Sequence, residues 1–467
     1  MNRTVVLDVV GLTPSLLGPD TPRLQQFAER GTLRPIQTIT PAVTCSVQST
    51  FVTGALPREH GCVANGWYFR DLAQVWLWRQ ANALVGGNKL WDLARARDDR
   101  FRCAKLFWWY NMYADVDWAV TPRPIYRANG RKHPDVHTSP VGLRERLDGE
   151  LGTFPLFNFW GPNANITSSQ WIADCASLME RWHEPTLSLV YLPHLDYALQ
   201  KYGPGAPESR AALREIDTLC GELIERFEAA GLRIVVLSEY GITPVTGPVH
   251  INRALREAGL LGWREEMGEE HFDAGASQAF AVADHQIAHV YVRDPGQIAE
   301  VKALLEKLDG VDEVLDRESM AAYGLDHPRS GELVALSKPE RWFSYYYWLD
   351  DARAPDYART VDIHRKPGYD PAELFLDPQL RAPMLRIGSY LLRTKVLGQR
   401  ALLDVIPLDG SLVRGSHGRV TASAEDGPLF ITNAPEQLRD ANGALLGDSQ
   451  SLEATAVQGV LLRHLFD

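Results

Sequence analysis

The stretches that decide the fold are two short apolar runs, TLSLVYL at residues 186–192 and LRIVVLS at residues 232–238, with a helical segment between them. That segment, from about Glu208 to Ala230, has helical periodicity, so the order is strand, helix, strand. An earlier run, TVVLDVV at residues 4–10, precedes a loop and a helix near Thr21–Arg30. This alternation predicts an α/β fold, a mixed sheet with helices on both faces.

Each of these three strands ends close to an acidic residue. Asp8 lies within the first run, Asp196 lies just past the second, and Glu239 directly follows the third. Ligands of open α/β sheets bind at the carboxyl ends of strands, so the three carboxylates are candidates to hold metal ions. Many enzymes that hydrolyse phosphate esters use two such ions to stabilise the attacking and leaving oxygens. A lone carboxylate in such a place is more often a helix cap or a loop charge.

Composition narrows the classes of function. The 467 residues are 45% hydrophobic and 23% charged, which is typical of folded globular proteins. The net charge of -11 argues against a nucleic-acid polymer as partner, because phosphate backbones need clustered Lys and Arg. Five cysteines without C-x-x-C spacing favour a reducing compartment. No apolar run approaches 18 residues and the N-terminus has no room for a signal peptide. We therefore expect a cytoplasmic protein without a membrane partner; the oligomeric state stays open.

The pattern of apolar and polar residues changes after Gly262. Strand-like runs and a short helix then follow one another closely, which predicts a small inserted α+β subdomain. We expect the main α/β core to comprise residues 1–264 and 396–467, with the insertion at 265–395.

The segment around Thr44 carries the most specific pattern. TPAVTCS at residues 40–46 is followed by TGALPREHG at residues 53–61 and then by Asn65. This order resembles the type I phosphodiesterase/nucleotide pyrophosphatase family of the alkaline phosphatase superfamily, in which a Thr in a P-x-x-T turn heads a helix. The resemblance implies that Thr44 is the nucleophile and a metal ligand, and that Asn65 binds a phosphoryl oxygen. From the residues alone, Thr44 is also explained as a helix N-cap.

Two further segments resemble the metal-binding motifs of that family. LPHLDYALQKYGP at residues 192–204 is similar to its P-D-x-x-G-H-x-x-G-P, with Asp196 on the Asp and Gln200 on the metal-binding His. SEYGI at residues 238–242 is similar to its S-D-H-G-M, with Glu239 on the Asp and Tyr240 on the His. Two imidazoles of the family are thus replaced.

Later histidines are candidates to complete the sites. His417, in GSHG at residues 415–418, resembles a late G-x-H-G element of the family. His364 lies in a polar loop bounded by Gly and Pro, and we expect it to replace a lost imidazole. His285 and His289 would lie too far apart on one strand to share a metal ion, so we expect supporting or structural roles for them.

The resemblance implies an alkaline-phosphatase-like fold that binds two divalent metal ions. The family suggests zinc, while an oxygen-rich ligand set favours Mn²⁺ or Mg²⁺. The predicted metal ligands are Asp8, Thr44, Asp196, Gln200, Glu239, His364 and His417.

The sequence therefore predicts a metal-dependent hydrolase of small-molecule phosphate esters that forms a phospho-threonine intermediate. Aromatic residues are dense between residues 67 and 118; most are expected to pack, but a slot that stacks a ring would favour a phosphodiester or nucleotide-like substrate. The alternatives are a phosphomonoesterase, a phosphonate hydrolase, or a non-catalytic binding protein that has lost its metals, as Gln200 and Tyr240 suggest.

Overall fold

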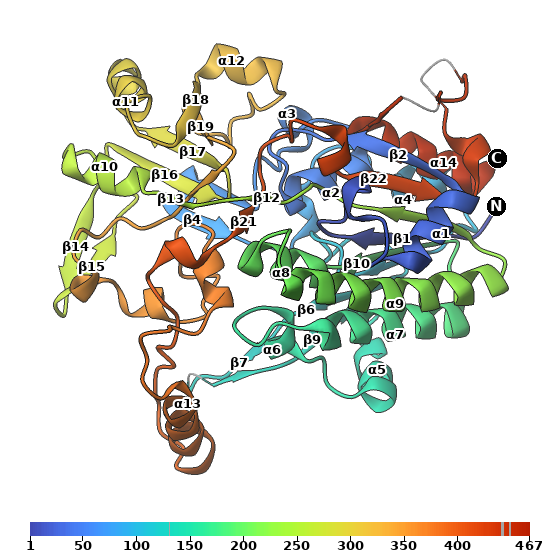
Figure 1. Cartoon of the computed structure of the whole chain (residues 1–467), viewed down its shortest axis with the longest axis horizontal. Helices are drawn as coiled ribbons and strands as arrows, with labels where there is room; N and C mark the ends of the chain where they lie inside the picture. Colours follow the sequence, from blue (N-terminus) through green and yellow to red (C-terminus); the bar gives the residue numbers. More distant parts are fainter. Residues whose placement is uncertain (130, 440–442, 448–449) are drawn as a thin grey trace.

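The computed structural model describes residues 1–129, 131–439, 443–447 and 450–467. A nine-stranded mixed sheet forms the larger part of the molecule, and a smaller antiparallel sheet lies to one side of it (Figure 1). The strand order of the large sheet is β23-β2-β22-β11-β1-β10-β5-β6-β9. Its strands are β1 (Thr4–Val9), β2 (Thr32–Gln37), β5 (Cys103–Leu106), β6 (Trp118–Pro122), β9 (Val136–Ser139), β10 (Leu187–Leu192), β11 (Arg233–Leu237), β22 (Leu429–Thr432) and β23 (Leu452–Glu453).

The three predicted strands form the centre of this sheet. β1 pairs in parallel with β10 on one side and with β11 on the other, and Asp8 lies opposite Tyr191 and Leu237. Because parallel strands end at the same edge, the loops after β10 and β11 meet beside Asp8. β22 and β2 continue the sheet in antiparallel pairing.

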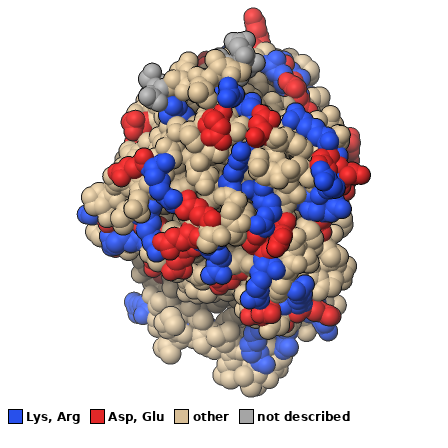
Figure 2. Space-filling view, turned by 90° about the vertical axis from the view of Figure 1, so that its right-hand side faces the viewer, with Lys and Arg blue, Asp and Glu red and all other residues tan. Residues whose placement is uncertain are grey.

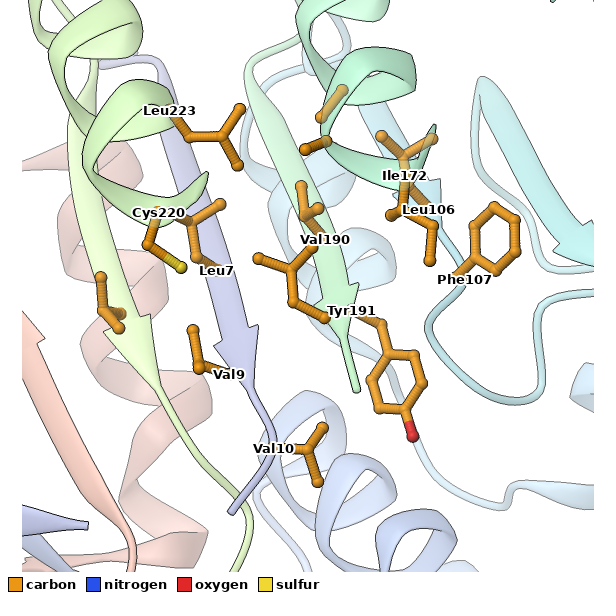
Figure 3. Packing of buried hydrophobic residues seen from close by; sticks show 14 of the residues in the cluster. Leu7, Val9, Val10, Leu106, Phe107, Ile172, Val190, Tyr191, Cys220 and Leu223 are labelled. Atoms are coloured by element: carbon orange, nitrogen blue, oxygen red, sulfur yellow. The ribbon is translucent and has the colours of Figure 1, made fainter. Parts of the chain in front are cut away.

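Helices cover both faces of the sheet, as predicted. Leu7 and Val9 point to the face covered by α1, α7 and α9, whereas Val6 points to the face covered by α2, α4 and α14. Figure 3 shows the first of these faces, with Leu7 and Val190 beneath Cys220 and Leu223 of α9. The two-residue period of a strand places Asp8 on the side of Val6, toward α2. The helices are α1 (Pro22–Arg30), α2 (Thr44–Thr53), α4 (Leu90–Arg97), α7 (Ile166–His183), α9 (Pro207–Ala229) and α14 (Val457–Phe466).

The smaller sheet has the order β16-β17-β19-β18 and its own hydrophobic core, which runs from Val249 to Tyr369 and includes Leu77. The bounds predicted for an inserted subdomain, residues 265–395, stay a prediction. The elements of this part are β3 (Gly66–Phe69), β4 (Gln74–Leu77), β13 (Gly247–Val249), α10 (Ile251–Glu257), β14 (Trp263–Glu266), β15 (Glu269–Phe272), β16 (Ala279–Asp284), β17 (Ile287–Val292), α11 (Ile298–Leu305), β18 (Val311–Leu315), α12 (Arg317–Ala322), β19 (Leu333–Ser337) and β20 (Arg341–Phe343).

Shorter elements connect these parts. They are α3 (Pro57–His60), β7 (Ile125–Tyr126), β8 (Lys132–His133), α5 (Leu143–Leu151), α6 (Leu156–Phe159), α8 (His194–Tyr202), β12 (Thr243–Pro244), α13 (Pro383–Leu391) and β21 (Gly415–Ser416). Among the described residues, no helix combines the length and the apolar character needed to cross a bilayer. The five cysteines are all buried and free of disulfides.

Candidate active site

Thr44 is the first residue of α2, which begins where the chain leaves the edge of the large sheet. The residue that caps this helix is Val43, without a side-chain hydrogen bond, so Thr44 is not the N-cap. Its hydroxyl instead lies 3.1 Å from the hydroxyl of Tyr240, and the side chain is buried. The N–H groups of a first helical turn lack partners within the helix and favour an anion. Thr44 therefore combines a hydroxyl with a local positive field.

Asp8 and Glu239 form a pair of carboxyl groups beside Thr44. Both are fully buried, and the amide nitrogen of Gln48 in α2 donates to one oxygen of each, at 3.1 Å from Asp8 and 2.6 Å from Glu239. The backbone N–H of Trp109 donates to the Gln48 oxygen at 2.7 Å. Because an N–H can face only the oxygen of the amide, this bond turns the Gln48 nitrogen toward the carboxyl pair.

Two oxygens of this pair, Asp8 Oδ1 and Glu239 Oε2, have no hydrogen-bond partner outside the pair. Burial raises the pKa of Asp8 well above its ordinary value, and the neighbouring charge of Glu239 raises it further. Burial also raises the pKa of Glu239 to about 7, against hydrogen bonds from Asp8, Thr44 and Gln48 that lower it. A shared proton or a bound cation satisfies such a pair.

Asp196, in the first turn of α8, has partners on both oxygens. Gln200 donates to Oδ2 at 2.7 Å, and the Tyr240 hydroxyl donates to Oδ1 at 3.2 Å. The Gln200 oxygen accepts a hydrogen bond from the Tyr369 hydroxyl at 2.8 Å, which fixes the orientation of the amide. Since the single proton of Tyr240 goes to Asp196, the Tyr240 oxygen can accept from Thr44, whose hydroxyl also lies within hydrogen-bonding reach of Glu239. Thr44, Tyr240 and Asp196 thus form one hydrogen-bonded chain.

Four aromatic rings stack in a column beside this chain. His285 lies between Tyr369 and His417, at centroid distances of 3.7 and 3.6 Å, and Tyr240 lies on the other face of His417 at 3.6 Å. His285 occupies the tight turn between β16 and β17 with φ of 59°. The column therefore joins the smaller sheet to the edge of the large one.

His417 reaches the site from the loop after β21. Its Nδ1 binds the carbonyl of Ala42 at 2.8 Å, and its Nε2 lies 3.9 Å from Asp196 Oδ1 without a hydrogen bond. Burial lowers the pKa of His417 to about 3, so the ring is neutral. Gly418 has φ of 119°, and a Cβ there would lie 2.9 Å from the Gln286 nitrogen, so only glycine fits this turn.

Asn65 lies beside the start of α2, and most of its hydrogen-bonding groups are already engaged. Its oxygen accepts from the Cys45 N–H at 2.9 Å, and its side-chain nitrogen donates to Asp284 at 3.1 Å. One amide hydrogen of Asn65 is left for a ligand. Asp284 is fully buried, and burial raises its pKa to about 7.

His364 is not joined to this group of residues by any interaction described in the structure. Burial lowers the pKa of His364, and its charged neighbours are Asp362, Arg79 and Lys132. His289 is structural: its Nε2 binds the carbonyl of Val63 at 3.0 Å. Thus the structure brings together Asp8, Thr44, Asn65, Asp196, Gln200, Glu239 and His417, and leaves His364 outside.

Sequence reasoning missed Gln48, Asp284 and Tyr369, and it gave His285 only a supporting or structural role. Gln48 lies four residues after Thr44, one helical turn along α2, so helical spacing was an available signal. Asp284 ends strand β16 of the smaller sheet, and Tyr369 lies in a loop that packs against that sheet, so no local pattern places them near Thr44.

The residues present fit one metal ion better than two. Asp8, Glu239 and Thr44 offer oxygen atoms as metal ligands. Two of these oxygens, Asp8 Oδ1 and Glu239 Oε2, are buried without a hydrogen bond from outside the carboxyl pair, and a set of oxygen ligands suits Mg²⁺ or Mn²⁺. On the side of the site around Asp196, both oxygens of Asp196 and the oxygen of Gln200 already accept hydrogen bonds within the protein. No group of three His, Cys, Asp or Glu side chains in the described part of the chain is arranged to hold a metal ion. The predicted ligand set of Asp196, Gln200 and His417 does not fit.

Comparison with known proteins identifies the family. The model of the type I phosphodiesterase/nucleotide pyrophosphatase family matches residues 4–370. The chain belongs to this family. An uncharacterised pyrophosphatase/phosphodiesterase of Schizosaccharomyces pombe is 26% identical over 239 residues, which cover 48% of this chain and 41% of the relative. Human ectonucleotide pyrophosphatase/phosphodiesterase family member 7 is 25% identical over 238 residues, 48% of this chain and 44% of the relative. The alignments thus span less than half the length of these relatives.

Solved structures confirm the alkaline-phosphatase-like fold predicted from the resemblance. Phosphonoacetate hydrolase of Sinorhizobium meliloti, in complex with phosphonoformate, has a TM-score of 0.62 at 16% identity, covering 99% of this chain and 96% of that one. Murine ectonucleotide pyrophosphatase/phosphodiesterase 5, in complex with AMP, has a TM-score of 0.57 at 14% identity, covering 100% and 95%. At these identities, the likeness between this chain and the two solved structures concerns the fold alone.

We predict that the metal-free protein loses stability as the pH rises toward neutrality. Burial raises the pKa of Glu239 from 4.5 to about 7, so between these values the folded protein holds a proton that the unfolded chain has released. The free energy of unfolding should therefore fall as the pH rises through this window, and Glu239→Gln should reduce the slope. Urea unfolding in the presence of a chelator measures this. An equal slope for Glu239→Gln and for the surface variant Glu59→Gln would contradict the prediction.

Proposed function

We propose that the chain hydrolyses small-molecule phosphate esters, with Thr44 as the nucleophile. The observation that carries this proposal is the hydrogen-bonded chain from Thr44 through Tyr240 to Asp196, at the N-terminus of α2 and beside a pair of carboxyl groups. Membership of the family supports the reaction class.

In the proposed reaction, the Thr44 oxygen attacks phosphorus and displaces the ester oxygen, which leaves a phospho-threonine. Water then attacks the same phosphorus and releases Thr44. The free amide hydrogen of Asn65 and the N–H groups at the start of α2 bind the phosphoryl oxygens. They hold the anion where its charge is offset by the helix dipole.

The chain's own residues supply a path for the Thr44 proton. As Thr44 attacks, its proton passes to the Tyr240 oxygen while the Tyr240 proton passes to Asp196 Oδ1. Gln200 holds the other oxygen of Asp196, and Tyr369 holds Gln200, so the acceptor is oriented before substrate binds. A positioned acceptor of this kind contributes general-base catalysis.

Asp8, Glu239 and Thr44 would hold one divalent cation, Mg²⁺ or Mn²⁺, in place of the zinc pair that the resemblance suggested. When bound, such a cation supplies positive charge that favours the deprotonated Thr44 and offsets the charge of the phosphoryl group. Gln48 keeps both carboxyl groups oriented toward Thr44, because Trp109 fixes the direction of its amide.

We infer that the substrate is a phosphodiester or a nucleotide-like ester. The names of the relatives support this class, and so do the aromatic rings near the site. Trp78 lies 4.8 Å from Trp109 and 6.1 Å from Tyr369 between ring centroids, and it is only half-buried. The alternatives are a phosphomonoesterase and a phosphonate hydrolase. Parallel assays with a diester, bis(4-nitrophenyl) phosphate, a monoester, 4-nitrophenyl phosphate, and a phosphonate, phosphonoacetate, distinguish the three activities.

A non-catalytic binding protein is the second candidate. The observation that favours it is the saturation of Asp196 and Gln200 by internal hydrogen bonds, together with a Thr44 side chain that is only 3% exposed. Such a protein would bind a phosphate ester without turning it over. We keep a cytoplasmic location as a prediction, which the free cysteines support.

Thr44→Ala is expected to lower the hydrolysis of bis(4-nitrophenyl) phosphate by at least about 10³-fold, because the attacking oxygen is lost. Thr53→Ala, in the same helix, is the matched control and should retain the activity. Steady-state kinetics with added Mn²⁺ measures both. Equal rates for Thr44→Ala and the native protein would remove Thr44 from the mechanism. Binding of AMP by calorimetry without any hydrolysis by the native protein would favour the second candidate.

Tyr240→Phe keeps the ring stacked on His417 but removes the hydroxyl from the proton path. We expect kcat to fall by roughly 10²–10⁴-fold, the usual contribution of a positioned proton-transfer group, with little change in KM. Circular dichroism should show an intact fold. A kcat equal to that of the native protein would show that the Thr44 proton leaves by another route.

The native protein is expected to bind one Mn²⁺ per chain, measured by equilibrium dialysis and elemental analysis. Asp8→Asn should abolish this binding. The double variant Gln200→His, Tyr240→His restores the two imidazoles of the family motif and should raise the count toward two with zinc. The double variant Gln200→Asn, Tyr240→Phe serves as the control and should stay at one. Two ions bound to the native protein would contradict the assignment.

A further inference from the structure

One end of the molecule carries an arm that projects away from both sheets. It consists of α13 and the helical turn Leu392–Val396 that continues it, and the β7–β8 hairpin reaches toward it from the edge of the large sheet (Figure 1). No described residue of α13 itself is buried. The arm is anchored at its base by Ile387, which packs against the cluster that contains Val405 and Ile406.

The free side of this arm is apolar. Met384 and Leu385 are 71% and 77% exposed, and Val396 is 72% exposed. With Leu391 and Leu392 they recur at helical spacing, so they share one side, while Ile387 and Thr394 lie on the side that faces the protein. A run of exposed aliphatic side chains on one helix indicates a surface that is covered in some state of the protein.

The arm and the hairpin are also strongly basic. Residues 118–134 and 378–403 together contain nine Lys and Arg and no Asp or Glu, in a chain whose net charge is -11. By contrast, the face shown in Figure 2 has Lys, Arg, Asp and Glu interspersed. The nine basic residues are Arg123, Arg127, Arg131, Lys132, Arg381, Arg386, Arg393, Lys395 and Arg400.

Hydrogen bonds to backbone carbonyls hold the hairpin against the arm. Arg131 donates to the carbonyl of Thr394 at 2.7 Å, and Arg400 donates to the carbonyls of Asn129 and Ala128 at 3.1 and 2.9 Å. Bonds to carbonyls leave the charge of both guanidinium groups uncompensated. Of these nine basic residues, Arg386 forms an ion pair with Asp404, and the partly buried Lys132 has Asp362 and Glu373 as charged neighbours. Ile125 and Tyr126 of the hairpin are exposed apolar residues as well.

We propose that the arm and the β7–β8 hairpin together, residues 123–129, 131–132 and 381–402, dock the protein on an anionic lipid surface. Aliphatic side chains on one side of a helix enter the boundary between headgroups and acyl chains, and flanking Lys and Arg attract acidic headgroups. The sequence predicts no membrane partner because none of its apolar runs is long enough to span a bilayer. An arm of this kind lies on the bilayer and needs no such segment.

Charge excludes the other occupants of this surface. A second copy that bound through the same surface would bring the same nine positive charges against these, and like charges across an interface oppose association. A nucleic acid would match the charge but not the aliphatic side, since phosphate backbones are bound by Lys, Arg and polar groups. An acidic bilayer satisfies both features of the arm.

Vesicle flotation with the full-length protein tests the proposal. The protein should float with phosphatidylcholine vesicles that contain phosphatidylserine, and stay unbound with phosphatidylcholine alone. Raising the salt concentration should weaken binding. Leu385→Ser with Val396→Ser should abolish it, and Arg393→Gln with Lys395→Gln should weaken it roughly fivefold per charge. The controls are Leu349→Ser with Val420→Ser and Arg181→Gln with Arg264→Gln, which change exposed residues elsewhere and should bind as the native protein does.

Three outcomes would overturn the proposal. The first is no binding to acidic vesicles. The second is binding that the apolar substitution leaves unchanged while a DNA oligonucleotide competes for it, which would assign the arm to polyanions. The third is a dimer in analytical ultracentrifugation that Leu385→Ser with Val396→Ser dissociates, which would assign the arm to a second copy. None of these outcomes depends on whether the chain hydrolyses phosphate esters.

Discussion

The burial of three carboxyl groups at one edge of the sheet is the constraint on which the rest of the site depends. Asp8, Glu239 and Asp196 are at most 5% exposed, and a buried carboxylate is costly unless hydrogen bonds, a proton or a cation compensate it. Gln48 donates to one oxygen of each of the first two, while Gln200 and Tyr240 give each oxygen of the third a donor. The site is therefore asymmetric: one half still favours a cation, and the other is already satisfied by the protein.

This asymmetry explains why Gln200 and Tyr240, which replace two histidines of the family motifs, occur together. A lone Gln200 or Tyr240 would leave part of Asp196 unpaired, whereas together they give each of its oxygens a donor. Tyr369 and the ring column then tie the smaller sheet to this arrangement. The same hydrogen bonds also connect Thr44, the proposed nucleophile, to Asp196, so the proposed reaction needs only one cation.

Much of the core could be predicted from the sequence. β1, β10 and β11 are short apolar runs, and α9 has a clear helical period, so local pattern decides them. β5 could not be found in the same way, since its four residues are too few to show a pattern and become a strand by pairing with β10 and β6. At the site, Thr44 and Asn65 lie within one continuous motif. Tyr369 comes from a loop more than 300 residues away, and only tertiary packing brings such a group to Thr44. His364 was proposed from its loop composition, which says nothing of distance.

The central claim is that one half of the site is built for a cation and the other for hydrogen bonds. Anomalous diffraction from crystals of the native protein soaked in Mn²⁺ tests it most directly. The account predicts one anomalous peak, between Asp8 and Glu239, with Tyr240 and Gln200 still bonded to Asp196. A second peak beside Asp196 and His417, or a single peak there with none at Glu239, would contradict it.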